Sequence, residues 1–565
     1  MSASALFSLG LLKDTASASL AALALRSPRS VAVEAAWLLG ELGDRGRAAI
    51  VAGLEDPSLG SPARGALLLA ATRLRPVPAV AIAPWLQSRD SAIAWRAAYA
   101  IARGRSAAAA RALLEQGASP WAAVREQGAR GATRAIVGDS LATLAREALA
   151  RLAADTSARV RVNAVRAVSS FGLSARAAVV SALTDPDPGV RLVAAQSLAS
   201  VLDTVARSWT APFDAETSFV VRRAVADGAI RHGINLASRA GWTASDDWRP
   251  RAAAVELDGS GAAEAAEGRL ERWTRDPDGR VRAAAAAAYA TLADSGLVRS
   301  VVRQRLRSML LDADVGVRTA SLGGLARGAS PDDLAVALAS YRMSLVDGDN
   351  DARLAFWHLA DTVLARHVAT LPDSVSTRLA TILRPLDPLE RNVAARINRF
   401  SAWRDSLGTA RPLAWYEERA RESALPPPTL SILTEQGTME LRLFAADAPL
   451  TVHNLVTLAE QGYFDGQRFH RVVPNFVVQG GDPRGDGNGG PGHAIRDELN
   501  RRRYGRGVLG MALSGPNTGG SQFFVTHSPQ PHLDGGYTVF GELLEGGDVL
   551  DRITQGDRIV RVTVH

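Results

Sequence analysis

The chain has 565 residues, of which 65 are lysine or arginine and 58 are aspartate or glutamate, for a net charge of +7. This length exceeds what one compact core holds, so it indicates several domains or an elongated repeat array. Cysteine is absent, which excludes disulfides, thiolate catalysis and cysteine-ligated metals. Because no run of 18 uncharged apolar residues occurs, we expect no membrane span.

The chain opens with "MSASALFSLGLLKDTAS", a short apolar stretch that no basic residue precedes. This pattern predicts a helix rather than a signal peptide. The compartment stays open. Cytoplasmic is the default, and the cell envelope or periplasm is the alternative if the sequence begins inside a longer exported precursor.

A fixed pattern recurs through the first two-thirds of the chain. "DPDPGVRLVAA" begins at Asp185, "DPDGRVRAAAA" at Asp276 and "DADVGVRTASL" at Asp312, each with valine five and arginine six residues after the aspartate. Successive copies start 29 to 36 residues apart. The same register fits Asp90 with Arg96, Ser119 with Arg125, Asp155 with Arg161, Glu216 with Arg222, Ser245 with Arg251, and Asp347 with Arg353.

Each copy predicts a pair of short helices. The aspartate or serine lies before a helix, where its side-chain oxygen can accept from unpaired first-turn N–H groups. The following Ala, Leu and Val recur at helical spacing and form an apolar face. Such a pair cannot bury its apolar sides alone, so neighbouring pairs stack into a solenoid. The unit resembles the HEAT repeat in its short form, and the resemblance implies that the arginines form a hydrogen-bonded ladder between repeats.

The arginine-rich composition raises a second interpretation, a phosphate-binding stripe for nucleic acid. From residue 429 onward there are 12 basic and 15 acidic residues, a net charge of −3, which leaves +10 for the rest of the chain. This is a mild excess over more than four hundred residues and does not favour nucleic acid. We expect a protein partner on the HEAT-like surface.

The helical periodicity fades after residue 401, and "SALPPPTL" closes the stretch with three prolines, which favour an extended spacer. "TLSILTEQGTMELRLF" then predicts a strand, a glycine turn and a second strand, and "LTVHNLVTLAEQGYF" predicts an amphipathic helix. The predicted organisation is a HEAT-like α-solenoid of about 11–12 helical pairs over residues 1–401, a proline-containing linker over 402–428, and a mainly β domain over 429–565.

Several apparent motifs of the chain are incomplete. "RGDGNGGPG" is not followed by a helix pattern, "GPNTGGS" lacks the lysine of a phosphate loop, and "ALSGP" lacks the first glycine of a nucleophile elbow. "DGDND" at residue 347 lacks the glycine and glutamate of a calcium loop. His470 and His527 have no partner at a metal-type spacing, so we expect both to be structural and predict no metal or cofactor.

Three segments of the C-terminal domain closely resemble the signature regions of cyclophilins, the peptidyl-prolyl cis-trans isomerases. They are "FHRVVPNFVVQGGDP", "GVLGMALSGPNTGGSQFFVTH" and "PHLDGGYTVFGELLEGGDVLDRI", and the resemblance runs from Leu430 to His565. It implies a closed antiparallel β-barrel with flanking helices. By position it implies Arg471 as the catalytic arginine, Gln479 as the glutamine that supports it, and Phe476 in the proline pocket. The implied substrate-binding positions are Val477, Ala512, Leu513, Gln522, Phe524, His532, Leu533 and Tyr537.

The sequence departs from the cyclophilin pattern at several of these positions. Leu513 stands where asparagine is usual, although the family contact there is largely through backbone. Val477 replaces a common methionine and keeps the pocket apolar but smaller. His532 replaces the tryptophan that helps bind cyclosporin, so we expect weak inhibition by that drug. Tyr537 replaces the usual histidine, as bacterial members often do, and Gly519 replaces an asparagine in a turn that both residues tolerate.

The expected function is peptidyl-prolyl isomerisation of a protein client that the solenoid recruits. The alternative is a non-catalytic scaffold that captures proline-containing segments. Isomerisation breaks no covalent bond, which explains why the expected site needs neither a nucleophile nor a metal beside Arg471.

Overall fold

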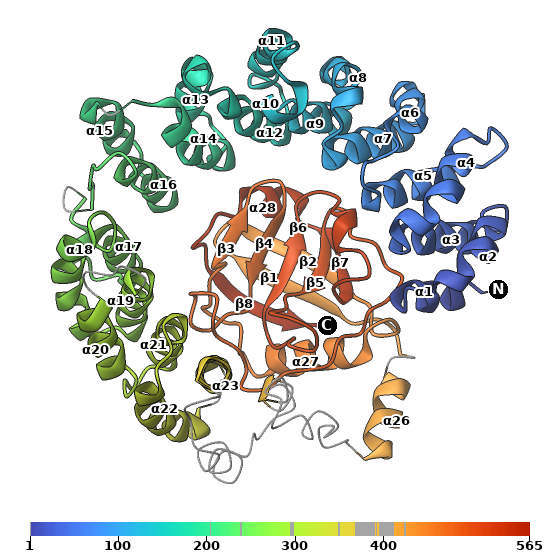
Figure 1. Cartoon of the computed structure of the whole chain (residues 1–565). Coiled ribbons are helices and arrows are strands. Elements are labelled where there is room, and N and C mark those ends of the chain that lie inside the picture. The colour runs from blue at the N-terminus through green and yellow to red at the C-terminus, as the bar shows by residue number, and fades with distance from the viewer. Residues whose placement is uncertain are drawn as a thin grey trace.

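The structure is a computed structural model of the whole chain. It describes residues 2–203, 205–237, 240–293, 299–347, 351–367, 390, 393–394, 412–422 and 425–565. Helices α1 to α23 form an open arc, and a β-rich C-terminal domain lies against its inner side (Figure 1). We call residues 3–366 the helical arc. The helical character predicted for the N-terminal region is confirmed.

The helical arc has an inner and an outer row of helices (Figure 1). In the inner row each helix contacts the next. The inner row contains α1 (Ala3–Leu11), α3 (Arg29–Glu41), α5 (Ser61–Ala70), α7 (Ser91–Gly104), α9 (Ala122–Gly131), α12 (Ala158–Val168), α14 (Pro188–Val201), α16 (Phe219–Ile230), α17 (Trp248–Asp258), α19 (Gly279–Leu292), α21 (Val315–Arg327) and α23 (Asp351–Arg366). The outer row contains α2 (Ala18–Ala24), α4 (Arg47–Glu55), α6 (Ala79–Ile82), α8 (Ala110–Glu115), α10 (Arg134–Val137), α11 (Ala142–Leu152), α13 (Arg176–Ser181), α15 (Ala206–Ala215), α18 (Ala263–Leu270), α20 (Arg299–Met309) and α22 (Pro331–Met343).

The repeated aspartates have two separate tasks, which the sequence pattern alone did not distinguish. In "DPDPGV" the second aspartate, Asp187, caps α14 by accepting from the N–H groups of Gly189 and Val190 at 2.8 and 3.0 Å. The first, Asp185, accepts from the N–H of Asp187 at 2.8 Å and pairs with Arg161 of the preceding repeat. One residue therefore starts the helix, and the other joins neighbouring repeats.

The predicted arginine ladder is present along the inner row. Each of its arginines pairs with a carboxylate of the next repeat and also donates to the carbonyls that begin its own repeat. The ion pairs are Arg125–Asp155 (2.7 Å), Arg161–Asp185 (2.8 Å), Arg191–Glu216 (3.0 Å), Arg251–Asp276 (2.9 Å), Arg282–Asp312 (2.7 Å) and Arg318–Asp347. The ladder has a gap at Arg222, whose register partner Ser245 carries no charge, and this guanidinium lies 4.4 Å from the ring centre of Phe213 instead.

The C-terminal domain contains one antiparallel sheet of eight strands in the order β3-β4-β6-β5-β7-β2-β1-β8. Two helices, α27 (Pro449–Glu460) and α28 (Gly547–Arg552), lie beside it. The predicted opening strand, turn, strand and helix are found as β1, β2 and α27. The strands are β1 (Thr429–Thr434), β2 (Gly437–Leu443), β3 (Arg471–Val473), β4 (Val477–Gly480), β5 (Val508–Met511), β6 (Phe523–Thr526), β7 (Val539–Glu545) and β8 (Ile559–Val564).

The sheet is a curled half-barrel, so the prediction of a closed barrel is wrong in this respect. Among the described strands, β3 and β8 are the two edges and do not pair with each other. Between them lie an isolated bridge from Arg468 to Arg558 and a bond from Phe469 N–H to the Asp557 carbonyl at 3.0 Å. The backbone bonds between the two edges involve residues 466–469, which precede β3, and the ladder does not continue along β3 itself.

The apolar side chains of the C-terminal domain form two separate clusters. The larger fills the concave side of the sheet and includes Phe464, Phe469 and Phe540. The smaller lies on the opposite side and contains Phe444, Val477, Tyr504, Val508, Phe524, Leu533 and Val539. Because alternate residues of a strand face opposite sides, Phe523 joins the first cluster and Phe524 the second.

Two further predictions concern segments outside these folded units. In the predicted linker 402–428, residues 402–411 lie outside the described residues, and Leu413–Glu422 forms helix α26, which packs against α27. The predicted repeats between residues 368 and 401 also lie almost wholly outside them. By length and composition, one apolar helical stretch of the described chain, residues 158–184, could cross a membrane. It is interrupted at Gly172, where φ is 65°, and forms the packed helices α12 and α13.

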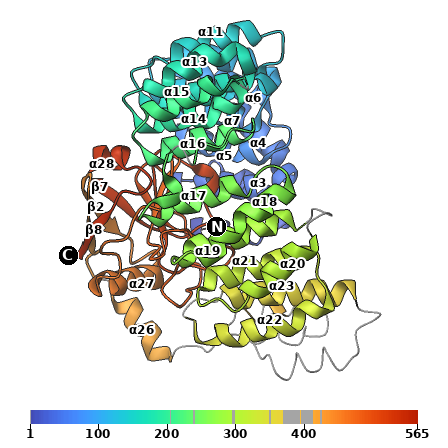
Figure 2. The same ribbon diagram turned by 90° about the vertical axis from the view of Figure 1, so that its left-hand side faces the viewer.

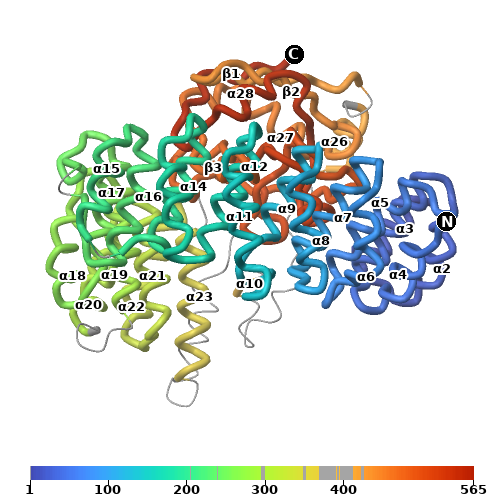
Figure 3. The backbone as a smooth tube through the Cα atoms, turned by 90° about the horizontal axis from the view of Figure 1, so that it is seen from above, coloured from blue at the N-terminus to red at the C-terminus, as the bar shows by residue number. Residues whose placement is uncertain are grey.

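The C-terminal domain lies beside the inner row of the helical arc (Figures 2 and 3). Its strand β3 and helix α28 lie near α12 and α14, which are far from them in sequence. The side of the domain that carries Phe524 and Leu533 faces the inner row. The helices that it contacts include α3, α7, α9 and the start of α21.

Candidate functional site

A short hairpin positions the predicted arginine. Strands β3 and β4 pair antiparallel, with Arg471 directly opposite Gln479. Asn475 forms the turn with φ of 62°, a backbone conformation that asparagine tolerates better than most residues. The Arg471 guanidinium donates from Nη1 to Oε1 of Gln479 at 3.2 Å and remains exposed to solvent. The sequence resemblance predicted this support of the arginine by the glutamine.

The polar contacts continue from Gln479 into the neighbouring loop. Gln479 donates from Nε2 to Oε1 of Gln522 at 3.1 Å. Gln522 in turn donates to the carbonyls of Gly487 and Gly489 at 3.0 and 2.9 Å. Both amides are thereby oriented, and the oxygen of Gln479 faces the guanidinium. The result is a chain of hydrogen bonds that ends in one donor-rich, exposed group, Arg471.

An apolar surface lies next to this chain. Phe476, Val477, Phe524 and Leu533 belong to one cluster, and Phe476 keeps part of its ring exposed. The Arg471 Cζ lies 5.9 Å from the ring centre of Phe476, so the cation borders the apolar floor. Tyr537 meets Phe524 edge to face with ring centres 6.0 Å apart. The three predicted segments therefore come together at one place.

Ala512 and Leu513 follow strand β5 but point to different sides. Ala512 packs against the cluster of Phe524, and its N–H donates to the Gln522 carbonyl at 3.0 Å. The Leu513 side chain packs against the inner core of the sheet instead. Leu513 can therefore offer the groove its backbone, whereas its side chain lies elsewhere.

His532 is shared between the apolar surface and the helical arc. Its ring stacks on Phe476 with centres 5.7 Å apart, and its Nδ1 lies 3.5 Å from the Tyr99 hydroxyl of α7. Desolvation, together with the positive charges of Arg103, Arg130 and Arg73, lowers the pKa of His532 to about 4. The imidazole is therefore neutral at neutral pH and suits an apolar contact.

The two histidines that we expected to be structural have depressed pKa values. Burial lowers the pKa of both His470 and His527. The Nε2 of His527 lies 3.1 Å from the Leu550 carbonyl, so this ring joins β6 to helix α28. Groups of three or more His, Asp or Glu side chains that could hold a metal ion do not occur within the described part of the chain.

The sequence analysis missed the residues that support the floor from below. Tyr504 stacks on Phe524 with ring centres 5.5 Å apart, and its hydroxyl donates to the Thr538 carbonyl at 3.2 Å. The N–H of Tyr504 donates to the buried carboxyl of Asp534 at 2.8 Å. Gly510 leaves room for both rings, because a Cβ there would lie 2.5 Å from the Tyr504 hydroxyl. Tyr504 lies outside the three signature segments, and only its aromatic character distinguished it in the sequence.

The arrangement therefore suits a small apolar ring on the cluster of Phe476 and Phe524. The Arg471 guanidinium beside it can donate a hydrogen bond without transferring a proton. The family described as "Cyclophilin type peptidyl-prolyl cis-trans isomerase/CLD" matches residues 429–564. The match begins at the first strand of the C-terminal domain and ends one residue before the C-terminus of the chain.

Proteins similar to this chain carry the same name. A peptidyl-prolyl cis-trans isomerase of Synechococcus elongatus is 50% identical over 133 residues, which cover 23% of this chain and 92% of the relative. One of Helicobacter pylori is 48% identical over 155 residues, covering 27% and 94%. The solved Cryptosporidium parvum cyclophilin type isomerase in the presence of the dipeptide Ala-Pro is 33% identical, covers 24% of this chain and 98% of its own, and has a TM-score of 0.23. The chain belongs to the cyclophilin family and is a peptidyl-prolyl cis-trans isomerase.

Proposed function

We propose that Arg471 is the catalytic group of this isomerase and that Phe476, Phe524 and Leu533 hold the proline ring. The observation that carries the proposal is the chain Gln522–Gln479–Arg471, which ends beside the exposed edge of Phe476. A guanidinium cannot lose its proton at neutral pH, so it can act as a donor and not as a base.

The chemistry requires little more than such a donor. Resonance gives the peptide C–N bond partial double-bond character and a rotational barrier of about 18–20 kcal/mol. For an X–Pro bond the cis and trans forms differ by only about 0.5–1 kcal/mol, so the rate is the obstacle. When the bond twists, the prolyl nitrogen regains a lone pair. Arg471 donates to that lone pair, or holds the preceding carbonyl, while the apolar floor keeps the ring in place.

Gln479 has a positioning role in this scheme. Its Oε1 accepts from Arg471, which fixes one of the two terminal nitrogens and directs the remaining donors toward the groove. Gln522 keeps the Gln479 amide in the required orientation, because Gln479 donates to its Oε1. A donor held in advance stabilises the twisted state without reorganisation during the reaction.

A protease-coupled assay of the full-length chain on a short Ala-Pro peptide tests the role of Arg471. Preorganised donors contribute about 2.7–4 kcal/mol, so we expect Arg471→Ala to lower kcat/KM by about 10²–10³-fold. Arg471 is exposed, so the variant should fold. Arg561→Ala, an exposed arginine on β8, is the matched control and should keep full activity. Wild-type activity no better than that of Arg471→Ala would overturn the assignment.

We further propose that the helical arc is a HEAT-like α-solenoid that recruits a proline-containing protein client. Its repeated ion-pair ladder and paired helices support the repeat assignment. The arc curves around the domain that carries the prolyl site, which keeps a bound client chain near Arg471 (Figure 1). NMR exchange spectroscopy on a client peptide separates catalysis from mere capture, since a pure binder shifts resonances without accelerating cis-trans exchange.

A further inference from the structure

The helical arc contacts the C-terminal domain around the prolyl site rather than on its opposite side. At the β3–β4 turn, Asn475 donates from Nδ2 to Oε1 of Glu126 in α9 at 2.9 Å. Pro474 packs against Gly189 of α14, where a Cβ would lie 3.2 Å from the proline ring. Asn475 directly precedes Phe476, so this contact lies at one edge of the apolar floor.

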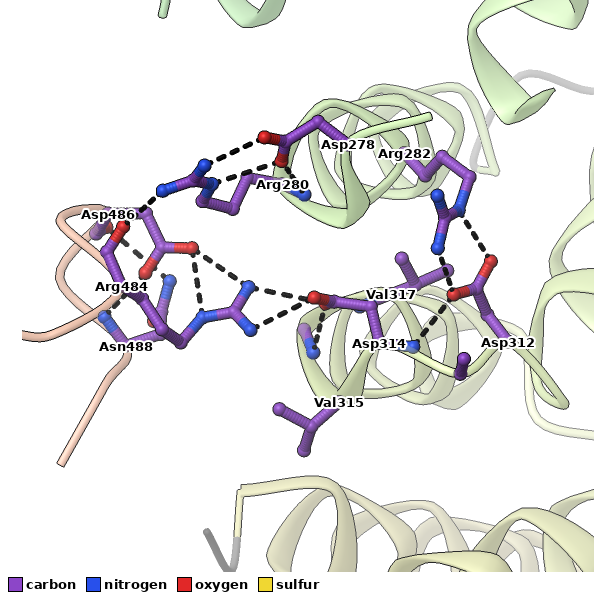
Figure 4. A network of polar contacts seen from close by, with 12 residues as sticks. Asp278, Arg280, Arg282, Asp312, Asp314, Val315, Val317, Arg484, Asp486 and Asn488 are labelled. Atoms are coloured by element: carbon purple, nitrogen blue, oxygen red, sulfur yellow. Dashed lines mark hydrogen bonds and ion pairs between the residues drawn. The ribbon is translucent and has the colours of Figure 1, made fainter. Parts of the chain in front are cut away.

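A second contact lies on the loop that follows β4. Arg484 donates from Nη1 and Nη2 at 3.0 and 3.2 Å to the carboxylate of Asp314, the residue that caps α21, and Arg280 of α19 donates to the Arg484 carbonyl at 2.9 Å (Figure 4). Asp486 holds the same guanidinium from the opposite side at 3.0 Å. This loop also supplies the carbonyls that orient Gln522, so the contact lies at the polar edge of the site.

A third contact lies at the far edge of the floor. His532, which stacks on Phe476, approaches Tyr99 of α7. Nearby, Arg503 pairs with Glu34 of α3 at 2.6 Å. Each of the three contacts adjoins the proposed site, since Asn475 directly precedes Phe476, the loop of Arg484 holds Gln522, and His532 stacks on Phe476. Arg471 and part of Phe476 nevertheless remain exposed, so the arc borders the groove without filling it.

We propose that the helical arc forms a second wall beside the prolyl site of Arg471 and Phe476. With this wall in place, the site admits prolines in extended, unstructured chain segments and excludes prolines held in folded loops. The inference rests on the proposed site around Arg471. An extended chain is narrow, since neighbouring strands lie only about 4.7–4.9 Å apart. A folded loop brings the bulk of its own domain to the groove, and that bulk would overlap with α7, α9 and α21.

The contacts that hold the wall in place are mostly polar. Those of Arg484, Asn475 and Arg503 are hydrogen bonds or ion pairs, and a cavity of about 250 Å³ remains between α12, α14 and the β3–β4 turn. Interfaces of this kind between domains of one chain permit relative motion. Substitutions on the surface of the C-terminal domain should therefore displace the wall without unfolding either region.

The test uses the full-length chain and one proline sequence in two forms: a linear peptide, and the same sequence as an exposed loop of a stable folded domain. NMR exchange gives kcat/KM for both. For the wild type we expect the folded loop to be turned over at one-tenth of the peptide rate or less. Arg484→Asp places a carboxylate opposite that of Asp314, and Asn475→Asp removes the amide that donates to the buried Glu126. This double variant should bring the ratio of the two rates close to one.

Two matched variants make the result specific. Arg484→Lys keeps a positive charge opposite Asp314, which stays in place to cap α21, and should keep the wild-type ratio. Arg561→Asp makes the charge change of Arg484→Asp at an exposed position on β8 and should leave the ratio of the two rates unchanged. Hydrogen exchange at residues 475–476 and 484–489 reports whether the wall has moved.

A wild-type ratio close to one would overturn the proposal. A ratio that stays low after hydrogen exchange shows displacement would also overturn it. If neither the wild type nor any variant turns over the linear peptide, the assignment of the site around Arg471 fails. That result would not depend on the wall.

Discussion

The helical arc and the C-terminal domain are both stabilised by apolar cores, but their specific contacts span different distances along the chain. In the arc, Arg161 pairs with Asp185 and Arg125 with Asp155, which are 24 and 30 residues away. In the C-terminal domain, Leu430 on β1 pairs with Val564 on β8, so the first strand needs the last. The arc can therefore lose a repeat contact locally, whereas the sheet forms as one unit.

A substitution in the arginine ladder has the largest expected effect and tests whether the arc can lose stability without affecting the sheet. Arg318 is fully buried, donates to the Ser344 hydroxyl at 3.0 Å and pairs with Asp347. Arg318→Met leaves the carboxylate and two carbonyls without their donor, so we expect a local loss of about 3–5 kcal/mol. Hydrogen exchange of α21 and α23 measures that loss, while activity on a short Ala-Pro peptide should stay within about twofold because the sheet folds separately.

Arg26→Met is the control for the ladder variant. Arg26 pairs with Asp56 at 2.6 Å, but 66% of its side chain is exposed. An exposed pair contributes about 0–1 kcal/mol, so the arc should keep its stability. If Arg318→Met abolished activity on the short peptide, the two regions would not be independent.

The pH dependence of stability tests the contact between the C-terminal domain and the helical arc, where the buried Asp534 lies. Burial raises the pKa of Asp534 to about 6, against the opposing effects of Arg503, of the Tyr504 N–H and of Arg73, while Glu34 adds to the rise. The folded chain therefore binds a proton that the unfolded chain releases between pH 4 and 6. This contribution is fully present below pH 4 and is lost as the pH rises through 6. We expect the stability difference between wild type and Asp534→Asn to change by about 2–3 kcal/mol from pH 4 to 7.

His532 supplies a control of opposite sign. Because its folded pKa is lowered to about 4, its contribution is present above pH 6.5 and is lost as the pH falls toward 4. Denaturation of His532→Gln over the same pH range should show the reverse slope relative to wild type. Parallel slopes for the two variants would contradict the assignment of these pKa shifts to the buried interface.

Glycine substitutions give the smallest expected effects, with opposite signs in the two regions. At Gly510 a Cβ would collide with the Phe524 ring and lie 2.5 Å from the Tyr504 hydroxyl. Gly510→Ala should cost about 1–3 kcal/mol and distort the proline floor. At Gly323 in α21 a Cβ has no neighbour within 4 Å, so Gly323→Ala should stabilise the arc by about 0.5–1 kcal/mol. Thermal unfolding compares the two, and equal effects would contradict this account of the packing.

Local sequence patterns predicted much of both regions. The recurring Asp-to-Arg register predicted where helices start, and the resemblance to HEAT repeats implied the inter-repeat ladder. Both depend on residues within one or two repeats, although Asp187 rather than Asp185 caps the helix. Alternating residues predicted β1 and β2, and helical spacing predicted α27. For the site, the resemblance to cyclophilins implied that Gln479 supports Arg471, and the antiparallel β3–β4 hairpin places the two residues opposite each other.

Other features depend on segments that are distant in sequence. The open edges of the sheet depend on where β3 and β8 lie relative to each other, which no local pattern specifies. The same holds for the floor, where Tyr504 reaches Phe524 through an irregular loop. The resemblance to cyclophilins implied a closed barrel because it transferred the fold of the family as a whole. It gave no information on how the edge strands of this chain pair.

The sequence by itself determined that this chain has a helical repeat region and an isomerase domain with an arginine beside an apolar floor. The repeat region follows from spacings of a few residues, which local hydrogen bonding translates directly into helices. The isomerase domain and its arginine were implied by the resemblance of three segments to cyclophilins. Only the tertiary structure decided that Tyr99, Glu126 and Asp314 approach the edges of that floor. Each of these contacts joins residues more than 150 positions apart, and their meeting depends on the summed curvature of the whole arc.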